Sequence, residues 1–176
     1  MTLFEYLAIA SSLVFSFAAM RLVSGLPHAI DADRRYWVHL CLVLTGLLAT
    51  AVSFWGFWFY RDAHWTLPRF LLALTGPCVT YFNACALVPD APGSVASWRR
   101  HYYSVRSKLF LGITLWSVAA ATTITVLLET PINHPFRVAE AVLFGVGVVG
   151  ASSDSPRVHA GLAMLLVALY SSQCSC

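Results

Sequence analysis

The sequence has few charged residues, and it does not interleave them with its apolar residues. Charged side chains make up 11% of the 176 residues and hydrophobic side chains 59%, whereas a soluble domain carries about 25% charged residues. The charges lie almost entirely between long apolar stretches, which excludes a soluble domain built from amphipathic helices. The alternating pattern of a membrane β-barrel is also missing. The sequence therefore predicts an all-α integral membrane protein.

Motifs that carry chemistry are missing as well. The sequence has no C-x-x-C pair, no Walker or G-x-S-x-G motif and no nucleotide fingerprint. Three of the five cysteines lie inside apolar stretches and predict no disulfide framework: Cys41, Cys78 and Cys85. The six histidines form no H-x-x-x-H pair and none lies in mid-span, where a metal or haem site buried in the bilayer needs them. We expect no catalytic residue, no metal and no cofactor.

Six apolar stretches predict about six transmembrane helices in a single domain, residues 1–176. A helix crosses the bilayer in about 20 residues. The predicted spans are 3–26, 37–60, 70–89, 109–129, 138–152 and 158–173. The last two are the shortest, so four spans followed by a re-entrant hairpin is the alternative. No basic residue precedes the first span, so no cleavable signal peptide is expected.

The most concentrated basic segment runs from Trp98 to Lys108. In a helix, one face of this segment would carry four large apolar or aromatic side chains: Trp98, Tyr102, Val105 and Leu109. Such a layout predicts a short helix near residues 94–108 that lies in the membrane interface with this face toward lipid. The candidates for binding anionic lipid headgroups or a partner protein are Arg99, Arg100, Tyr102, Arg106 and Lys108. A topology anchor with no binding role is the alternative.

The loops differ in their number of basic residues, which predicts an orientation. The first, third and fifth loops hold Arg34, Arg35, Arg99, Arg100, Arg106, Lys108 and Arg157. The second and fourth loops hold only Arg61, Arg69 and Arg137. Because cytoplasmic loops are enriched in Lys and Arg, we expect the odd-numbered loops in the cytoplasm and both termini outside.

A few polar residues lie within the apolar stretches. The third stretch is the most polar and contains Gly76-Pro77, which would interrupt the helix and free backbone carbonyls. Thr80 and Asn83 follow this break, and Glu140 is an ionisable residue just inside the fifth stretch. Thr80, Asn83 and Glu140 are therefore the candidates for a transport path. Ordinary helix packing and a Glu140 side chain that reaches the interface are the alternatives.

Several strings resemble those of small uncharacterised bacterial inner-membrane proteins. They are Arg21–Leu26, Arg35–His39, Phe54–Trp58, Val88–Asp90 and His101–Arg106. The resemblance covers most of the chain. It implies an inner-membrane location and a polytopic helical architecture, and it implies no activity.

Loops this short cannot hold a soluble active site, so the function must lie in the bilayer, at its surfaces or in a complex. The first hypothesis is a non-enzymatic inner-membrane component that binds lipid or assembles with other membrane proteins or with its own copies. The second is a small oligomeric transporter or channel for an ion or small solute. The third is a membrane haem or metal protein. The net charge of +3 comes from residues at helix ends, so no nucleic-acid partner is expected.

Overall fold

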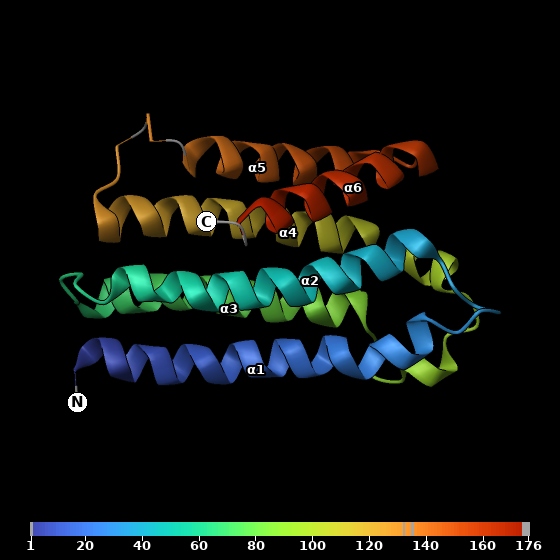
Figure 1. The fold of residues 1–176 in the computed structure, drawn as a ribbon, viewed down its shortest axis with the longest axis horizontal. Helices are drawn as coiled ribbons and strands as arrows, with labels where there is room; N and C mark the ends of the chain where they lie inside the picture. Colours follow the sequence, from blue (N-terminus) through green and yellow to red (C-terminus); the bar gives the residue numbers. More distant parts are fainter. Residues whose placement is uncertain (1, 132, 135, 174–176) are drawn as a thin grey trace.

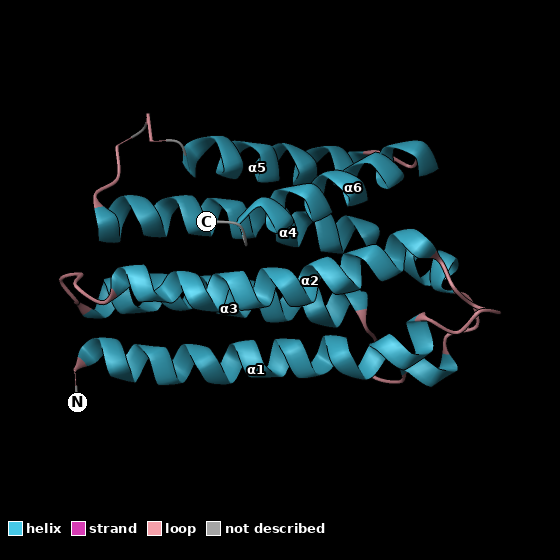
Figure 2. Ribbon diagram, viewed as in Figure 1, coloured by secondary structure: helices cyan, strands magenta, loops and turns pink. Residues whose placement is uncertain are grey.

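The protein is a bundle of helices that run along one common axis. The computed structural model describes residues 2–131, 133–134 and 136–173, and no strand occurs in these ranges. The helices are α1 (Leu3–Ala29), α2 (Trp37–Gly56), α3 (Leu67–Leu87), α4 (Trp98–Leu128), α5 (Phe136–Ser152) and α6 (Pro156–Gln173), with short 3-10 helices η1 (Phe57–Tyr60) and η2 (Pro92–Ser94). Consecutive helices are antiparallel (Figures 1 and 2).

Four helical segments, and not six, are long and apolar enough to cross a membrane within the described ranges. They are Leu3–Ala29, Trp37–Tyr60, Leu67–Ser94 and Trp98–Leu128. The prediction of six spans is therefore wrong on this criterion. With 17 residues, α5 is about 25 Å long at 1.5 Å per residue, which is less than the hydrocarbon thickness of about 30 Å. With 18 residues, α6 is scarcely longer, and its ends are polar.

The outer surface of the four long segments is apolar. Side chains of α1 that are more than half exposed include Leu13, Phe17, Met20 and Val23, and those of α2 and η1 include Trp55, Trp58 and Phe59. A soluble monomer rarely exposes contiguous apolar area on this scale. Contact with lipid accounts for this surface, so the chain is a multi-pass membrane protein.

Residues 94–108 do not form a separate interfacial helix. After η2, the chain enters α4 at Trp98 with the Ser97 hydroxyl as N-cap, and α4 continues for 31 residues. Trp98, Tyr102 and Leu109 lie inside the bundle and are at most 2% exposed. The prediction that this face contacts lipid is wrong, because the face packs against other helices of the same chain.

Gly76-Pro77 does not break the third helix. Pro77 is buried inside α3, which is continuous from Leu67 to Leu87. Proline removes only one backbone hydrogen bond, and the Thr80 hydroxyl donates to the Gly76 carbonyl at 3.0 Å one turn away. The helix therefore supplies no broken-helix site of the kind that transporters use.

Glycines set the distances between neighbouring helices. A Cβ atom on Gly147 of α5 would lie 2.1 Å from Thr114 Oγ1 of α4, and a Cβ on Gly150 would lie 2.2 Å from the ring of Phe110. Gly112 allows the same close approach between α4 and Asn83 of α3. Small residues commonly permit such contacts between membrane helices.

Candidate functional site

The three odd-numbered loops meet at one end of the bundle, on the right of Figure 1. Trp98 joins two of them, because its indole N–H donates to the His28 carbonyl at 2.7 Å and its backbone N–H to the Arg34 carbonyl at 3.2 Å. Arg34 Nη1 donates in turn to the Gly93 carbonyl at 3.1 Å. We call this end, formed by residues 28–36, 88–108 and 153–159 together with the side chain of Arg21, the basic end.

Charge is distributed unequally between the two ends of the bundle. The basic end holds eight basic residues: Arg21, Arg34, Arg35, Arg99, Arg100, Arg106, Lys108 and Arg157. It holds four acidic residues: Asp31, Asp33, Asp90 and Asp154. The opposite end holds only three basic residues and the other four acidic ones. The antiparallel helices therefore concentrate all of the excess positive charge on one surface.

Three partly buried arginines form ion pairs with three of these four carboxylates. Arg21 pairs with Asp90 at 2.5 Å and also donates to the Val88 carbonyl. Arg106 pairs with Asp154 and donates to the Ser153 carbonyl. These contacts hold the third and fifth loops against α1 and α4.

The third pair lies within the first loop. Arg34 contacts Asp31 at 2.6 Å, and the Arg34 guanidinium holds the pKa of the Asp31 carboxyl below its usual value of 3.8. Arg34 also donates to the Gly93 and Val95 carbonyls of the neighbouring loop. Arg34 therefore joins loops, as Arg21 and Arg106 do.

Five basic residues of this end remain exposed: Arg35, Arg99, Arg100, Lys108 and Arg157. Within the part of the chain that the structure describes, none of them forms an ion pair. They come from the first loop, from the first three turns of α4 and from the start of α6, so segments far apart in sequence contribute to one positively charged end. Phosphate groups are the natural ligands of exposed arginines.

The structure divides the predicted binding residues into two groups. Arg99, Arg100 and Lys108 are exposed, whereas Tyr102 lies in the core and the Arg106 side chain is 16% exposed and ion-paired. Arg35 and Arg157 are exposed at the same end, but the sequence pattern indicates them only as orientation signals and not as binding candidates. Their positions in odd-numbered loops could have identified them, because those loops must share one surface if the helices alternate.

Beneath this surface lies a cluster of aromatic and histidine side chains from α2, α4 and α6. The Tyr102 hydroxyl lies 2.7 Å from His159 Nδ1, and His159 Nε2 lies 2.8 Å from the Ser153 carbonyl. A carbonyl only accepts, so His159 Nε2 carries the proton and Nδ1 accepts from the tyrosine hydroxyl. Both residues are fully buried, and this chain of hydrogen bonds links α4 to α6 and to the fifth loop.

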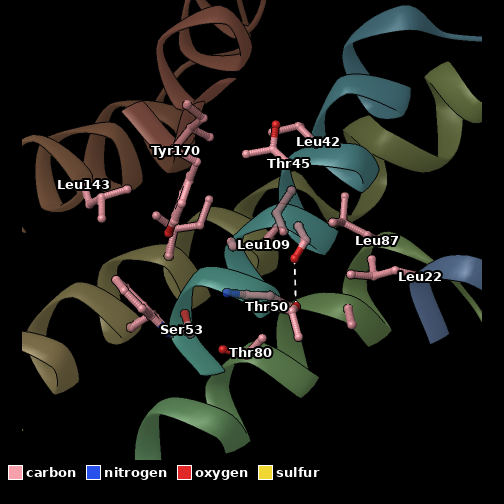
Figure 3. A pocket seen from close by; sticks show the side chains of 17 residues that line it. Leu22, Leu42, Thr45, Thr50, Ser53, Thr80, Leu87, Leu109, Leu143 and Tyr170 are labelled. Atoms are coloured by element: carbon pink, nitrogen blue, oxygen red, sulfur yellow. Dashed lines mark hydrogen bonds between the residues drawn. The ribbon is translucent and has the colours of Figure 1, made fainter. Parts of the chain in front are cut away.

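A cavity of about 80 Å³ lies at the centre of the bundle, where side chains from all six helices face one another (Figure 3). Its lining is mostly apolar and includes Leu22, Leu109, Leu143, Leu166 and Trp116. The polar lining residues are Thr45, Thr50, Ser53, Thr80, Asn83 and Tyr170. The Thr50 hydroxyl donates to the Gly46 carbonyl of its own helix at 2.7 Å, which is the dashed line in Figure 3. Asp, Glu, Lys and Arg are missing from this lining, as far as the structure describes it.

Glu140 lies apart from this cavity. Its carboxylate pairs with Arg137 Nη1 at 2.9 Å, and Arg137 also donates to Thr125 Oγ1 and to the Thr130 carbonyl. Arg137 and Glu140 border a separate groove whose other lining residues belong to α4 and α5. The structure therefore brings Thr80 and Asn83 together but places Glu140 elsewhere.

Comparison with known proteins finds no matching family model, no matching curated protein and no matching solved structure. The resemblance noted in the sequence therefore identifies no family. The fold itself establishes a helical protein with four apolar helices of membrane length.

Proposed function

We propose that the protein is a non-enzymatic component of a bacterial inner membrane that binds anionic lipid headgroups at its basic end. The observation that carries this proposal is that some basic residues of this end form ion pairs within the protein whereas others remain exposed and unpaired. Three arginines that are partly buried take up most of the nearby carboxylates. Five exposed basic residues from separate segments are left without a partner of opposite charge within the described structure, so they are available to bind an external anion.

The electrostatics favour a membrane surface as the source of that anion. A basic residue close to an anionic leaflet contributes about 1 kcal/mol to binding. Because cytoplasmic loops are enriched in Lys and Arg, we place the basic end on the cytoplasmic side. There the long α4 would carry Arg99 and Arg100 at the level of the headgroups.

Lipid retention by the purified protein tests this proposal. The full chain in mild detergent is titrated with phosphatidylglycerol or phosphatidylcholine, and bound lipid is counted by native mass spectrometry. Two variants with equal charge change are compared: Arg99→Gln with Arg100→Gln at the basic end, and Arg61→Gln with Arg69→Gln at the opposite end.

We expect the wild type to prefer phosphatidylglycerol and the Arg99/Arg100 variant to lose about 30-fold in affinity, since two residues contribute roughly 2 kcal/mol. The Arg61/Arg69 variant should keep its preference. Equal losses in both variants, or none, would rule out the basic end as the headgroup site.

Assembly with a protein partner is the alternative use of the same surface. In that case the Arg99/Arg100 variant would lose a co-purifying subunit or its own oligomer while lipid preference stays unchanged. The two outcomes are read from the same native spectra, because bound lipid and bound protein differ greatly in mass.

The central cavity favours a second candidate, passage of a small uncharged solute. Thr80 and Asn83 line it, and none of its described lining residues is charged, which favours an uncharged solute over an ion. If this candidate holds, Asn83→Ala changes solute flux in liposomes and Glu140→Gln does not. Unchanged flux in Asn83→Ala would exclude the cavity as a path.

A further inference from the structure

We propose that Tyr36 and Tyr103 select the lipid that binds at the basic end, and that they favour an anionic phospholipid whose headgroup ends in hydroxyl groups. This inference rests on the proposed headgroup binding and names the class of lipid. It begins with the two phenolic oxygens, which lie 3.5 Å apart although one residue is the N-cap of α2 and the other lies in the second turn of α4. Both side chains are half-buried.

Exposed arginines flank both tyrosines. Arg35 directly precedes Tyr36 in the chain. Arg99 lies four residues before Tyr103 in α4, so the two side chains share one face of the helix, with Cβ atoms about 5–6 Å apart. Burial raises the pKa of the Tyr36 phenol well above its usual value of 10.0, the Tyr103 hydroxyl adds to this rise, and the nearby positive charge of Arg99 opposes it. The tyrosine pair therefore lies beside a guanidinium of the kind that binds phosphate.

The tyrosine pair has hydrogen-bonding capacity to spare. Each phenol carries one proton and can also accept a hydrogen bond. One proton at most serves the contact between the two oxygens, and neither hydroxyl has another hydrogen-bond partner among the described residues. Tyr102 differs, because its hydroxyl is bonded to His159. The pair can therefore offer an O–H donor and an acceptor to the same ligand.

A hydroxyl group on the ligand matches this pair, because it both donates and accepts. A carboxylate or a phosphate oxygen only accepts, and an ammonium group only donates. The excess positive charge of the basic end also repels an ammonium group. The chemistry therefore favours a phosphate on Arg99 with hydroxyl groups against the tyrosines, as in phosphatidylglycerol. It disfavours phosphatidylserine, whose headgroup carries an ammonium group and a carboxylate.

Comparison of two lipids with equal net charge tests the inference. The full chain in mild detergent is titrated with phosphatidylglycerol, phosphatidylserine or phosphatidylcholine, and bound lipid is counted by native mass spectrometry. The variant Tyr36→Phe with Tyr103→Phe removes both hydroxyls and keeps both rings. The variant Tyr6→Phe with Tyr60→Phe removes two hydroxyls at the opposite end and serves as the control.

We expect the wild type and the control to bind phosphatidylglycerol about threefold to tenfold more tightly than phosphatidylserine, which corresponds to one hydrogen bond. The Tyr36/Tyr103 variant should bind the two anionic lipids equally and still prefer both to phosphatidylcholine.

Three outcomes would overturn the role of the tyrosines while headgroup binding stands: equal binding of the two anionic lipids by the wild type, an unchanged ratio in the Tyr36/Tyr103 variant, or the same loss in the control. A wild type that does not prefer anionic lipid to phosphatidylcholine would contradict headgroup binding itself, and this inference with it.

Discussion

The buried hydroxyl of Tyr102 joins α4 to α6 at the basic end. It donates to His159 Nδ1, which has no other partner among the described residues, and the imidazole is held in place by the Ser153 carbonyl. Removal of the hydroxyl leaves a buried acceptor without a donor, and such a loss costs roughly 1–3 kcal/mol. Tyr102 therefore stabilises the fold beneath the charged surface and does not itself contact lipid.

We predict that Tyr102→Phe lowers the thermal stability of the protein in detergent by an amount of that size. Tyr103→Phe is the matched control, because the Tyr103 hydroxyl is only half-buried and lies 3.5 Å from that of Tyr36. Thermal unfolding followed by circular dichroism compares the two. A melting temperature for Tyr102→Phe equal to that of Tyr103→Phe would show that the Tyr102–His159 contact contributes little.

At the scale of the helices, the contact between α4 and α5 depends on a glycine. A side chain at Gly147 would collide with Thr114 and with the Phe110 carbonyl, which belongs to the backbone and cannot rotate away. A Cβ atom on Gly145 of the same helix would meet no atom of another described element within 4 Å. The two glycines therefore differ in packing although they are two residues apart.

We predict that Gly147→Leu separates α5 from α4 and destabilises the protein by about 1–3 kcal/mol, the range typical of overpacking. Gly145→Leu should be close to neutral, because its side chain enters open space or lipid. Thermal unfolding of both variants in the same detergent measures the difference. Equal stability of the two variants would mean that α5 does not pack against α4 in this register.

The sequence predicts the helices well and their contacts poorly. Apolar stretches locate the elements, but an apolar helix face packs equally well on lipid or on protein. The helical pattern alone therefore places Trp98 against lipid, whereas the side chain lies in the core. Arg99 and Arg106 are seven residues apart and follow the same helical pattern. They differ because the fifth loop brings Asp154 to Arg106, which then forms an ion pair within the fold. No such loop approaches Arg99, which stays exposed.

Features that depend on local chain length or composition are easier to predict. The last two apolar stretches are the shortest in the sequence, and the helices that they form, α5 and α6, are not among the four of membrane length. Thr80 and Asn83, which the polarity of their stretch singles out, both line the central cavity, although the sequence does not predict the cavity itself. The pairing of Glu140 with Arg137 is also local, because the two lie three residues apart. Arg137 makes a further hydrogen bond to Thr125 of α4, which the local sequence does not predict.

At the scale of the whole molecule, three loops form one basic surface, and the central claim is the proposal that this surface faces the cytoplasm. Antiparallel packing accounts for the single surface, because it returns the chain to the same end after α1, α3 and α5 (Figure 1). The ion pairs of Arg21 and Arg106 then fix the third and fifth loops to α1 and α4. The proposals on lipid binding and on orientation both rest on the geometry of this end.

Labelling of single cysteines with a membrane-impermeant maleimide tests that claim most directly. In a cysteine-free background, one cysteine is introduced at Ala32, Ala96, Ser155 or His64, and sealed vesicles of both orientations are compared. The account predicts that the first three react only from the cytoplasmic side and that the cysteine at position 64 reacts only from the other side. Reaction of any of the three from the same side as position 64 would contradict it.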